Sequence, residues 1–283
     1  GGLRKVLVSF QFFISILLII ATFSIISQMD YIQNKKLGFE KGQTLIIHNF
    51  NLLAQNREAF DNTLRALPQV QETSNTWFLP TSSSRSSTVF FPDAVVDQER
   101  GVVSQNWTVD VHYADVFGMK MKEGRFFQEE FQTDSTVMVI NETAARLFNL
   151  DDLESATIGS FEEEGEGLRP YKVIGIVEDF HFQSLKEEIG PVIMRLGNGG
   201  LLALKLNGDD YPSVINEARR QWDEFAAGQP FEYTFLDDRF TNMYQAESRL
   251  GDVFSAFALL AIIIACLGLF GLAAFTAQQK TKE

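Results

Sequence analysis

Two long uncharged stretches lie near the two ends of the chain. No charged residue occurs between Lys5 and Asp30, or between Asp252 and Lys280. Each stretch is mostly apolar and exceeds the roughly 20 residues that a helix needs to cross a bilayer core. The first follows basic residues, as in a signal peptide, but it is too long for that and no small-residue cleavage site follows it. We therefore predict two transmembrane helices, over residues 1–29 and 253–279.

Basic residues flank the outer ends of both predicted spans: Arg4, Lys5, Lys280 and Lys282. Under the positive-inside rule both outer ends face the cytoplasm, and residues 280–283 begin a cytoplasmic segment. Residues 30–251 then lie on the far side of the membrane. The chain starts Gly-Gly and stops just past a span, so we expect a piece of a longer polypeptide.

The polar segments next to the spans also have a helical pattern. Residues 30–43 contain no helix breaker before Gly38, which fits the position just beyond a helix C-terminus, so the helix is expected to reach about Leu37. Residues 238–252 contain no proline and run directly into the second span. We predict two stalk helices that lie side by side. Their candidate contact residues are Tyr31, Met243, Tyr244 and Glu247.

A first β-α-β pattern occupies residues 44–79. A β-branched run at 44–48 is followed by Phe60, Leu64 and Leu67 at helical spacing, and Pro68 ends the helix. A strand-like run then covers residues 70–79.

A second pattern of the same kind occupies residues 199–237. The strand-like run 201–206 is followed by a helix with Asp210 as N-cap and Pro212 in its first turn. The apolar face of that helix consists of Ile215, Ala218, Trp222 and Phe225. Residues 231–235 alternate as a half-buried strand does. The two units predict a duplicated α/β subdomain.

Residues 80–198 separate the two units as a mostly β insertion. Its Ser-rich start, residues 81–90, is expected to be a loop or an edge strand. Three further strand-like runs cover 102–111, 136–140 and 171–177. A short helix is expected at 142–148 with Asn141 as its cap, and the charged, Gly-rich segment 161–170 as a solvated hairpin tip. The predicted fold class is thus α+β, with two transmembrane helices and stalks around a central domain.

Charge and composition support this arrangement. The chain has 283 residues, a net charge of −13 and a mean hydropathy of −0.03, which conceals the two apolar spans. We subtract the four flanking basic residues and the two acidic residues Asp252 and Glu283. The segment between the spans then has 20 basic and 35 acidic residues, a net charge of −15. This acidity argues against a nucleic-acid partner. The single cysteine, Cys266, excludes a disulfide scaffold and a multi-cysteine metal site.

Asp179 and His181 are the one pairing that could carry acid–base or metal chemistry. In a strand both side chains would lie on one face, with Phe180 and Phe182 in the core on the other. His48 and His112 have no supporting ligand pattern, so a structural role is the preferred interpretation. We expect no metal and no cofactor.

Acidic pairs and triplets occur at Asp151–Asp152, Glu162–Glu164 and Asp237–Asp238. None has the spacing of a calcium loop, and we expect solvated loops. No G-x-S-x-G nucleophile motif occurs. A P-loop sequence is also absent, so these residues do not themselves hydrolyse ATP.

Small residues recur at three- and four-residue spacing in the second span: Ala258, Ala261, Ala265, Gly268 and Gly271. Such a stripe lets helices approach closely in lipid. The alternative is simple tolerance of small residues in membrane helices. We predict a packing face, with the first span or another copy as partner. Gln11 in the first span is costly against lipid and is expected to face another helix.

Several segments together resemble the MacB/FtsX-type ABC transporter permeases, most closely the large permeases of Bacteroidetes. They are residues 3–41, the runs YADVFGMKMKEGRFF (113–127), VINETAARLF (139–148) and GIVEDFHFQSLKEEIGP (175–191), and residues 231–283. The resemblance covers nearly the whole chain and keeps the order of the family. It implies a second periplasmic core domain with its two flanking helices, in which residues 44–79 and 199–237 correspond to the porter part and 80–198 to the sabre part.

The same resemblance implies the function. Such permeases sit in the bacterial inner membrane with this domain in the periplasm, dimerise, and pair with a cytoplasmic ABC ATPase. ATP-driven dimerisation moves the spans and stalks, and the movement is relayed to the periplasm (mechanotransmission). The family has no catalytic residues here, so we expect no enzyme activity. The further partners it implies are membrane lipid, a second permease copy or half, and a periplasmic adaptor or substrate protein. The substrate differs between members.

Two other functions fit parts of the pattern. A ligand-sensing extracytoplasmic domain of a two-span receptor would have the same topology. A membrane-anchored periplasmic hydrolase is disfavoured because no nucleophile constellation is present. Further membrane spans after residue 283 would favour the permease, whereas a signalling helix would favour the receptor.

Overall fold

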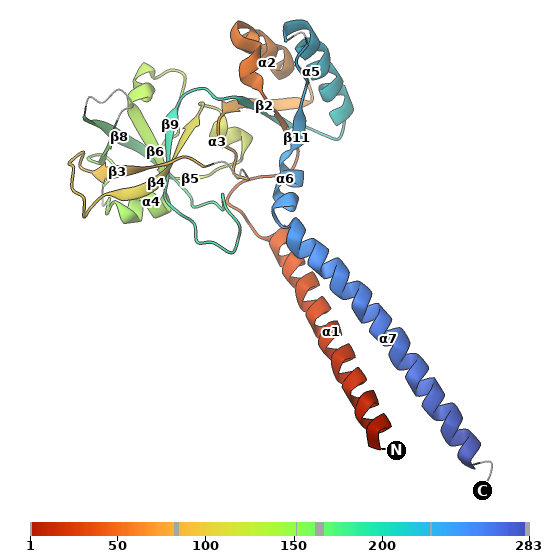
Figure 1. Ribbon diagram of the computed structural model, residues 1–283. Coiled ribbons are helices and arrows are strands. Elements are labelled where there is room, and N and C mark those ends of the chain that lie inside the picture. The colour runs from red at the N-terminus through yellow and green to blue at the C-terminus, as the bar shows by residue number, and fades with distance from the viewer. Residues whose placement is uncertain (1, 82–84, 151, 162–166, 227, 281–283) are drawn as a thin grey trace. The chain divides into compact units, whose positions relative to one another are not determined.

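The computed structural model describes residues 2–81, 85–150, 152–161, 167–226 and 228–280. The chain divides into two compact units, one formed by residues 1–35 with 241–283 and the other by residues 36–240. The first unit is helical and the second, here called the central domain, is a mixed α and β structure (Figure 1). The predicted α+β class with two terminal membrane helices is confirmed.

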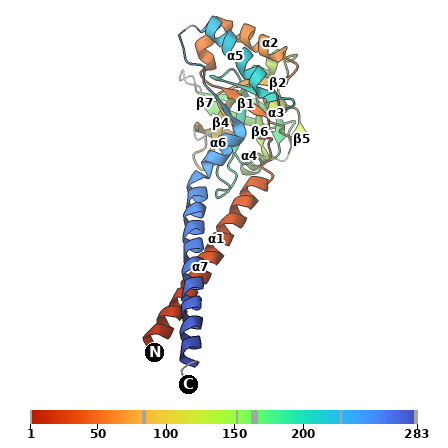
Figure 2. The ribbon, with the colours of Figure 1, turned by 90° about the vertical axis from the view of Figure 1, so that its right-hand side faces the viewer.

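The helical unit consists mainly of α1 (Gly2–Asn34) and α7 (Gln245–Lys280), which pack along each other. Figure 2 shows that they run in opposite directions, so that the beginning of α1 and the end of α7 lie at the same end of the pair. Both are long and apolar enough to cross a membrane, over Val8–Asn34 and Gln245–Gly271. α1 stops at Asn34, three residues before the predicted end at Leu37.

The second stalk differs from the predicted continuous helix. The chain forms α6 (Leu236–Met243), interrupts it at Tyr244 and then starts α7. The Tyr244 amide donates to the Thr241 carbonyl three residues back, a tighter turn than that of an α-helix. No proline or glycine marks this interruption, so sequence patterns did not reveal it.

The central domain contains two lobes. In the first, called the helical lobe, the strands pair antiparallel in the order β11-β1-β10-β2. These strands are β1 (Thr44–Ile47), β2 (Val70–Thr76), β10 (Leu201–Leu206) and β11 (Tyr233–Phe235). A 3-10 helix, η1 (Phe50–Asn56), leads into α2 (Arg57–Arg65), and α5 (Tyr211–Phe225) follows β10. Figures 1 and 2 both show α2 and α5 side by side over this sheet.

The core of the helical lobe lies between these helices and the sheet. Phe60 of α2 meets Trp222 of α5 edge-on, with ring centroids 6.0 Å apart, and neither side chain is exposed. Leu45, Leu202 and Leu204 of the strands complete the same cluster. The two predicted β-α-β units are therefore present, and their apolar helix faces bury a shared core. The predicted cap of α5 is also present, because Asp210 accepts a hydrogen bond from the Ser213 amide.

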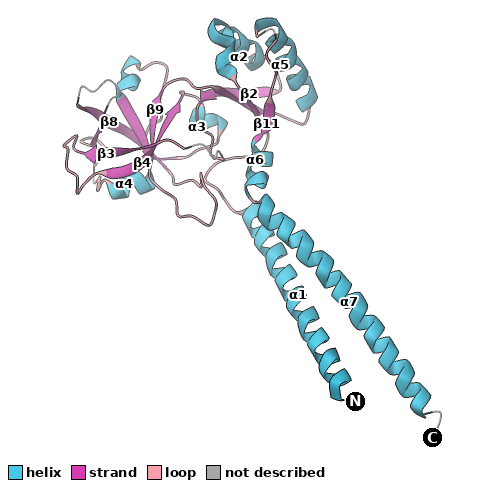
Figure 3. Cartoon of the chain, viewed as in Figure 1, coloured by secondary structure: helices cyan, strands magenta, loops and turns pink. Residues whose placement is uncertain are grey.

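The second lobe, called the ring lobe, is built on strands that close on themselves. Within the described residues, the pairings run β4-β3-β7-β8-β6-β9 and back to β4. The strands are β3 (Ser87–Pro92), β4 (Val102–Val109), β6 (Val137–Asn141), β7 (Thr157–Phe161), β8 (Leu168–Val177) and β9 (Val192–Leu196), with β5 (Met121–Gly124) paired to β8. Figure 3 shows this group of strands apart from the helical lobe.

The short helix α3 (Tyr113–Val116) packs against β2 and β10 of the helical lobe, whereas η2 (Gln132–Thr136) and α4 (Glu142–Leu147) belong to the ring lobe. Its core includes Phe90, Ile140, Ile158 and Ile193, all without exposed surface. The predicted helix after Asn141 is confirmed, since Asn141 Oδ1 caps it by accepting from the Ala144 amide at 3.0 Å. β7 and β8 pair antiparallel on either side of the predicted hairpin tip, whose residues 162–166 lie outside the described part of the chain.

The two lobes meet where β2 and β4 come together. β2 pairs with β4 through the residues Thr76 and Val109. Gly199, in the link between β9 and β10, lies so close to Thr76 that an added Cβ would collide with the Thr76 backbone. The Gly199 amide also donates to the Asn75 side chain.

Candidate functional site

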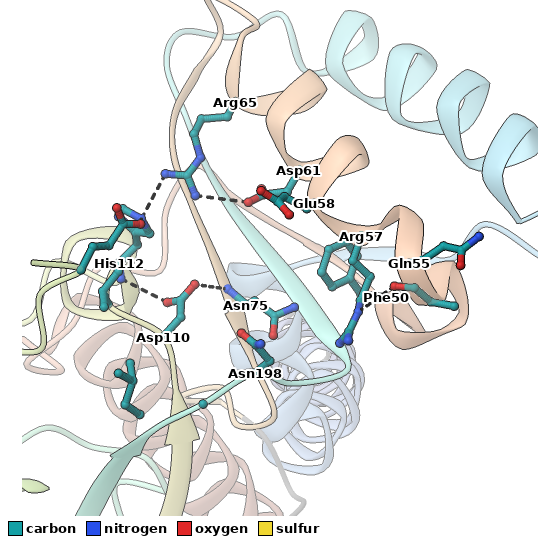
Figure 4. Close-up of a pocket in the computed structure, with 15 residues that line it drawn as sticks. Phe50, Gln55, Arg57, Glu58, Asp61, Arg65, Asn75, Asp110, His112 and Asn198 are labelled. Carbon is teal, nitrogen blue, oxygen red and sulfur yellow. Dashed lines mark hydrogen bonds and ion pairs between the residues drawn. The ribbon is translucent and has the colours of Figure 1, made fainter. Parts of the chain in front are cut away.

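A cleft of about 740 Å³ opens between the helical lobe and the ring lobe (Figure 4). We call it the interlobe cleft. One wall is η1 and α2, the other is the turn after β4 together with Glu129, and the β9–β10 link closes one side. Its volume lies within the range typical of ligand pockets, about 300–1,000 Å³. Most of the side chains lining it are polar or charged.

Asp110 lies on the floor of this cleft, one residue beyond β4. Its Oδ1 accepts from the Ser74 hydroxyl at 2.6 Å and from the His112 amide at 3.2 Å, and its Oδ2 accepts from the Asn75 amide at 2.6 Å. These donors come from the edge of β2 and from the Asp110 turn itself. Burial raises the pKa of Asp110 to about 6, and these hydrogen bonds only partly offset that effect. The site thus holds a carboxylate whose charge is poorly compensated.

Arg65 organises the wall on the α2 side. Its Nη1 lies 2.6 Å from Glu72 Oε1, and its Nη2 lies 2.7 Å from the Thr73 hydroxyl and 3.3 Å from Asp61 Oδ2. The Thr73 hydroxyl in turn donates to Asp61 Oδ1 at 2.6 Å. This network ties α2 to β2, so the charge of Arg65 is already matched by two carboxylates.

His112 stands at the opposite wall. Its Nε2 lies 3.2 Å from Arg65 Nη1 and 3.4 Å from Glu129 Oε1, and its Nδ1 lies 3.6 Å from Glu72 Oε2. The residue therefore bridges the ring lobe to the Arg65 network. The sequence showed no ligand pattern for His112. The structure surrounds it with two carboxylates and one guanidinium, which together form a polar network.

The rim of the cleft is acidic and locally strained. Glu58 is exposed, and the side chain of Glu129 is 77% exposed. Ala54 has φ 48° and ψ −115°, a conformation that favours glycine, and its carbonyl accepts from Arg57 Nε at 3.2 Å. Strained backbone of this kind tends to persist at functional sites, because the surrounding structure holds it in place.

The polar groups lining the cleft are mainly carboxylates and amides, with two arginines and one histidine. No group of three or more His, Cys, Asp or Glu side chains able to hold a metal ion occurs in the part of the chain that the structure describes. The nucleophile–base pair that acyl transfer needs is also not formed by the residues lining the cleft. What the cleft offers is carboxylates, amide groups and water access.

The candidate helix-packing residues of α7 differ in burial, and their role as a packing face stays a prediction. Ala258 and Ala265 are buried, Ala261 and Gly268 are half-buried, and Gly271 is exposed. Gly251 and Gly268 approach α1 directly, because an added Cβ would lie 3.0 Å from Ile25 Cγ2 and 3.7 Å from Gln11 Oε1 respectively. In the described part of α1, the positions of low exposure share one face and are mostly three or four residues apart: Val8, Gln11, Phe12, Ser15, Leu18, Ala21, Thr22, Ile25, Met29 and Ile32.

The candidate stalk contacts lie in different environments. Tyr31 is 57% exposed and lies under the Lys35 ammonium, 5.3 Å from its ring centroid. Tyr244 is buried at the interruption between α6 and α7, whereas Met243 and Glu247 are half-buried. Ile32, one residue after Tyr31, is the buried member of that turn of α1. The predicted contact between the stalks through these residues remains a prediction.

The Asp179–His181 pair has a structural environment. Residues 178–182 form a loop after β8, so the strand geometry that would place both side chains on one face does not occur here. Asp179 accepts from the Asn141 side chain and from the amide and hydroxyl of Thr143, which fastens this loop to the start of α4. Phe180 and Phe182 are buried, as predicted.

The acidic clusters are partly described. Asp151 and Glu162–Glu164 lie outside the described residues, and Asp152 is exposed. Asp237 and Asp238 are exposed as expected, but they stand in the first turn of α6 and not in a loop. Carboxylates at a helix N-terminus interact favourably with the helix dipole, which explains their place.

The cleft residues were missed at the sequence level, apart from His112. Asp110 contacts Ser74 and Asn75, 36 and 35 positions away in the chain, and no local pattern predicts that contact. The only signal in the sequence was a charged residue, Asp110, near the end of the strand-like run 102–111. The strained Ala54 has no sequence signature, since glycine is the residue expected in its conformation.

Comparison with known proteins gives one family match and several structural likenesses. Residues 12–214 match the family described as the MacB-like periplasmic core domain. A crystal structure of the periplasmic region of MacB from Actinobacillus actinomycetemcomitans is 19% identical, covers 73% of this chain and 94% of that one, and has a TM-score of 0.50. The extracellular domain of the ABC-type transporter YknZ from Gram-positive bacteria is 16% identical over 62% of this chain and 87% of that one, with a TM-score of 0.44. No curated protein sequence matches.

Proposed function

The chain belongs to the family of the MacB-like periplasmic core domain, and from that premise we propose that it is a non-catalytic part of an ABC transporter permease. Its central domain works in the periplasm, and α1 and α7 anchor it in the inner membrane. A cytoplasmic ABC ATPase drives the permease, which acts as a dimer of copies or halves. The permease relays movement of the spans to the periplasm and does not itself carry out chemistry.

The observation that supports this proposal most is the seam between α1 and α7. Residues of low exposure recur every three or four positions on both helices, as in antiparallel coiled coils. Small side chains such as Ala258 and Ala265 allow the close packing that drives helix association in lipid. A pair joined along a continuous seam can transmit a displacement along its length, because packed helices shift as stiff elements.

The proposal is tested by cysteine pairs across the seam in the complete ATPase complex. Ile25→Cys with Gly251→Cys joins two positions in direct contact, and Cys266→Ser removes the native cysteine. We expect the crosslinking yield to change between the ATP-bound and nucleotide-free states. Phe13→Cys with Phe257→Cys, at side chains more than half exposed, is the matched control and should not crosslink.

The outcome separates the proposal from its main alternative. If the Ile25–Gly251 pair crosslinks with the same yield in the ATP-bound and nucleotide-free states, that result contradicts mechanotransmission through these helices. In that case the ligand-sensing domain of a two-span receptor becomes the better explanation, because its movements would follow a ligand and not ATP.

A further inference from the structure

We propose that the interlobe cleft binds an organic cation, whose ammonium or guanidinium group meets the carboxylate of Asp110 on the floor and those of Glu58 and Glu129 at the rim. The proposal concerns the central domain alone. It holds whether or not the membrane helices relay force.

The first support is the environment of Asp110. Its three hydrogen-bond donors are a hydroxyl and two backbone amides, all neutral. Within the described residues no lysine or arginine forms an ion pair with it. The nearest titratable group that favours its charge is His112, and Asp110 itself is half-buried. A ligand cation of good geometry would therefore stabilise the charged carboxylate. A carboxylate also has room for about four hydrogen bonds, so one acceptor position is left for a ligand.

The second support is that the arginines beside the cleft have other partners. Arg65 is held by Asp61 and Glu72, so it does not neutralise Asp110. Arg57 Nε donates a hydrogen bond to the carbonyl of the strained residue Ala54, at the opposite end of the cleft from His112 (Figure 4). Among the residues lining the cleft, the four carboxylates of Glu58, Asp61, Asp110 and Glu129 outnumber the two guanidinium groups of Arg57 and Arg65, and His112 lies 3.4 Å from Glu129.

The third support is the shape and lining of the space. An acidic rim alone would mean little on a domain as acidic as this one, since such residues usually serve solubility. Here the rim surrounds a cleft of about 740 Å³ that leads down to the half-buried carboxylate of Asp110. Gln55, Asn75 and Asn198 add amide groups along the walls, which both donate and accept hydrogen bonds. That lining suits a polar cation with several hydrogen-bonding groups.

The same cation chemistry has two sources, a small polyamine or a basic side chain of a polypeptide. Calorimetry of the complete chain in lipid nanodiscs distinguishes them with two probes, spermidine and a blocked Lys-Ala-Lys tripeptide. A blocked Gln-Ala-Gln tripeptide controls for charge. We expect saturable binding of at least one cationic probe and none of the neutral one, with affinity that falls as salt rises.

Variants then locate the site. Asp110→Asn should weaken binding at least about tenfold, because it removes the half-buried charge. The double variant Glu58→Gln, Glu129→Gln changes only exposed side chains of the rim and should weaken binding about three- to tenfold without affecting folding. The matched control is Glu99→Gln with Asp209→Asn, two exposed acidic residues away from the cleft, which should bind as the wild type does apart from a small screened effect.

Each outcome decides the question. Tighter binding of spermidine assigns the cleft to free amines, and tighter binding of the tripeptide assigns it to a basic polypeptide segment. Absence of saturable binding by both cationic probes overturns the proposal. Binding that the rim variant and the control variant weaken equally also overturns it, because it would then reflect the acidity of the whole surface.

Discussion

Arg125 and Asp134 form a two-pronged salt bridge, in which Nη1 and Nη2 of the arginine each lie 2.7 Å from a different carboxylate oxygen. The Asp134 side chain has no exposed surface, and its Oδ2 also accepts from the Gln128 amide at 3.0 Å. The Arg125 guanidinium stacks 4.2 Å from the Phe131 ring centroid. The contact closes the loop between β5 and β6 onto the ring lobe.

Asp134→Asn should therefore destabilise the protein strongly. The amide keeps the shape but cannot accept both guanidinium hydrogen bonds, and a buried pair that loses one partner costs about 3–5 kcal/mol. Because Arg125 is one-third exposed, we expect the lower part of this range. Thermal and urea unfolding of the detergent-solubilised protein measure the loss. Asp209→Asn, at an exposed position, serves as the control, and an equal effect of both changes would contradict the prediction.

Titration of the Asp110 carboxyl should make the stability of the protein depend on pH. Burial raises its pKa to about 6 from 3.8, so the folded protein holds this proton more tightly than the unfolded chain does. The contribution of Asp110 to the free energy of unfolding is fully present below pH 3.8. It is lost as the pH rises through about 6, and the loss is about 3 kcal/mol at most. Urea unfolding at intervals between about pH 4.5 and 7.5 measures it, and Asp110→Asn should remove this component.

Asp134 and His48 change the stability with pH in the opposite direction, and their effects can be separated from that of Asp110. The hydrogen bond from Arg125 lowers the pKa of Asp134, so its contribution is present above pH 3.8 and lost only at lower pH. Burial, and then Arg239, lower the pKa of His48 below 6.5, so its contribution is lost as the pH falls through the lowered pKa. The difference between wild type and Asp110→Asn cancels both. Identical pH profiles for the two proteins would contradict the assignment.

Trp222→Ala should disrupt the helical lobe. The indole is fully buried between α2 and α5, packs on Phe60, and donates from Nε1 to the Gln229 carbonyl at 3.1 Å. Removing such a side chain costs about 3–5 kcal/mol. Leu52→Ala, at a side chain that is 43% exposed, should cost far less. The measurement is the midpoint of thermal unfolding, and similar shifts for both variants would argue against the described core.

The elements of the helical lobe were largely predictable because they depend on local patterns. Trp222 and Ala218 repeat at helical spacing, and Asp210 with Pro212 marks the helix start, so α5 followed from neighbouring residues alone. The same applies to Asn141 at the start of α4. The closed ring of strands was not predictable in this way. The parallel pairing of Trp107 with Met194, for example, joins residues far apart in the chain.

The interlobe cleft belongs to the same unpredictable class. Its lining comes from η1, α2, β2, the turn after β4 and the β9–β10 link, which only the folding of both lobes brings together. The residue types at this point, such as Asp110 and Arg65, are common on surfaces. Only their burial and their partners distinguish them, and both are properties of tertiary structure.

Gly199→Ala should test the contact between the lobes. A methyl group there collides with the Thr76 backbone, which no side-chain rotation can relieve, so the β9–β10 link must shift. We expect a loss of about 1–3 kcal/mol, as for other overpacked positions. Gly42→Ala is the matched control, because nothing lies within 4 Å of the added methyl group. Thermal unfolding compares the two. A Gly199→Ala protein as stable as Gly42→Ala would mean that the lobes do not meet as described.

The last prediction concerns the seam between the two membrane helices. Ala258 is 6% exposed in the pair formed by α1 and α7, whereas Ala256, two residues earlier, faces outward. Ala258→Leu adds three heavy atoms where the helices approach closely, and small residues are what allows that approach in lipid. We expect it to push α7 from α1 and lower the crosslinking yield of the Ile25→Cys, Gly251→Cys pair at least severalfold. Ala256→Leu adds the same volume towards lipid and should leave the yield unchanged. If the two leucine variants crosslink alike, the small residues of α7 serve another partner, and a second permease copy becomes the first candidate.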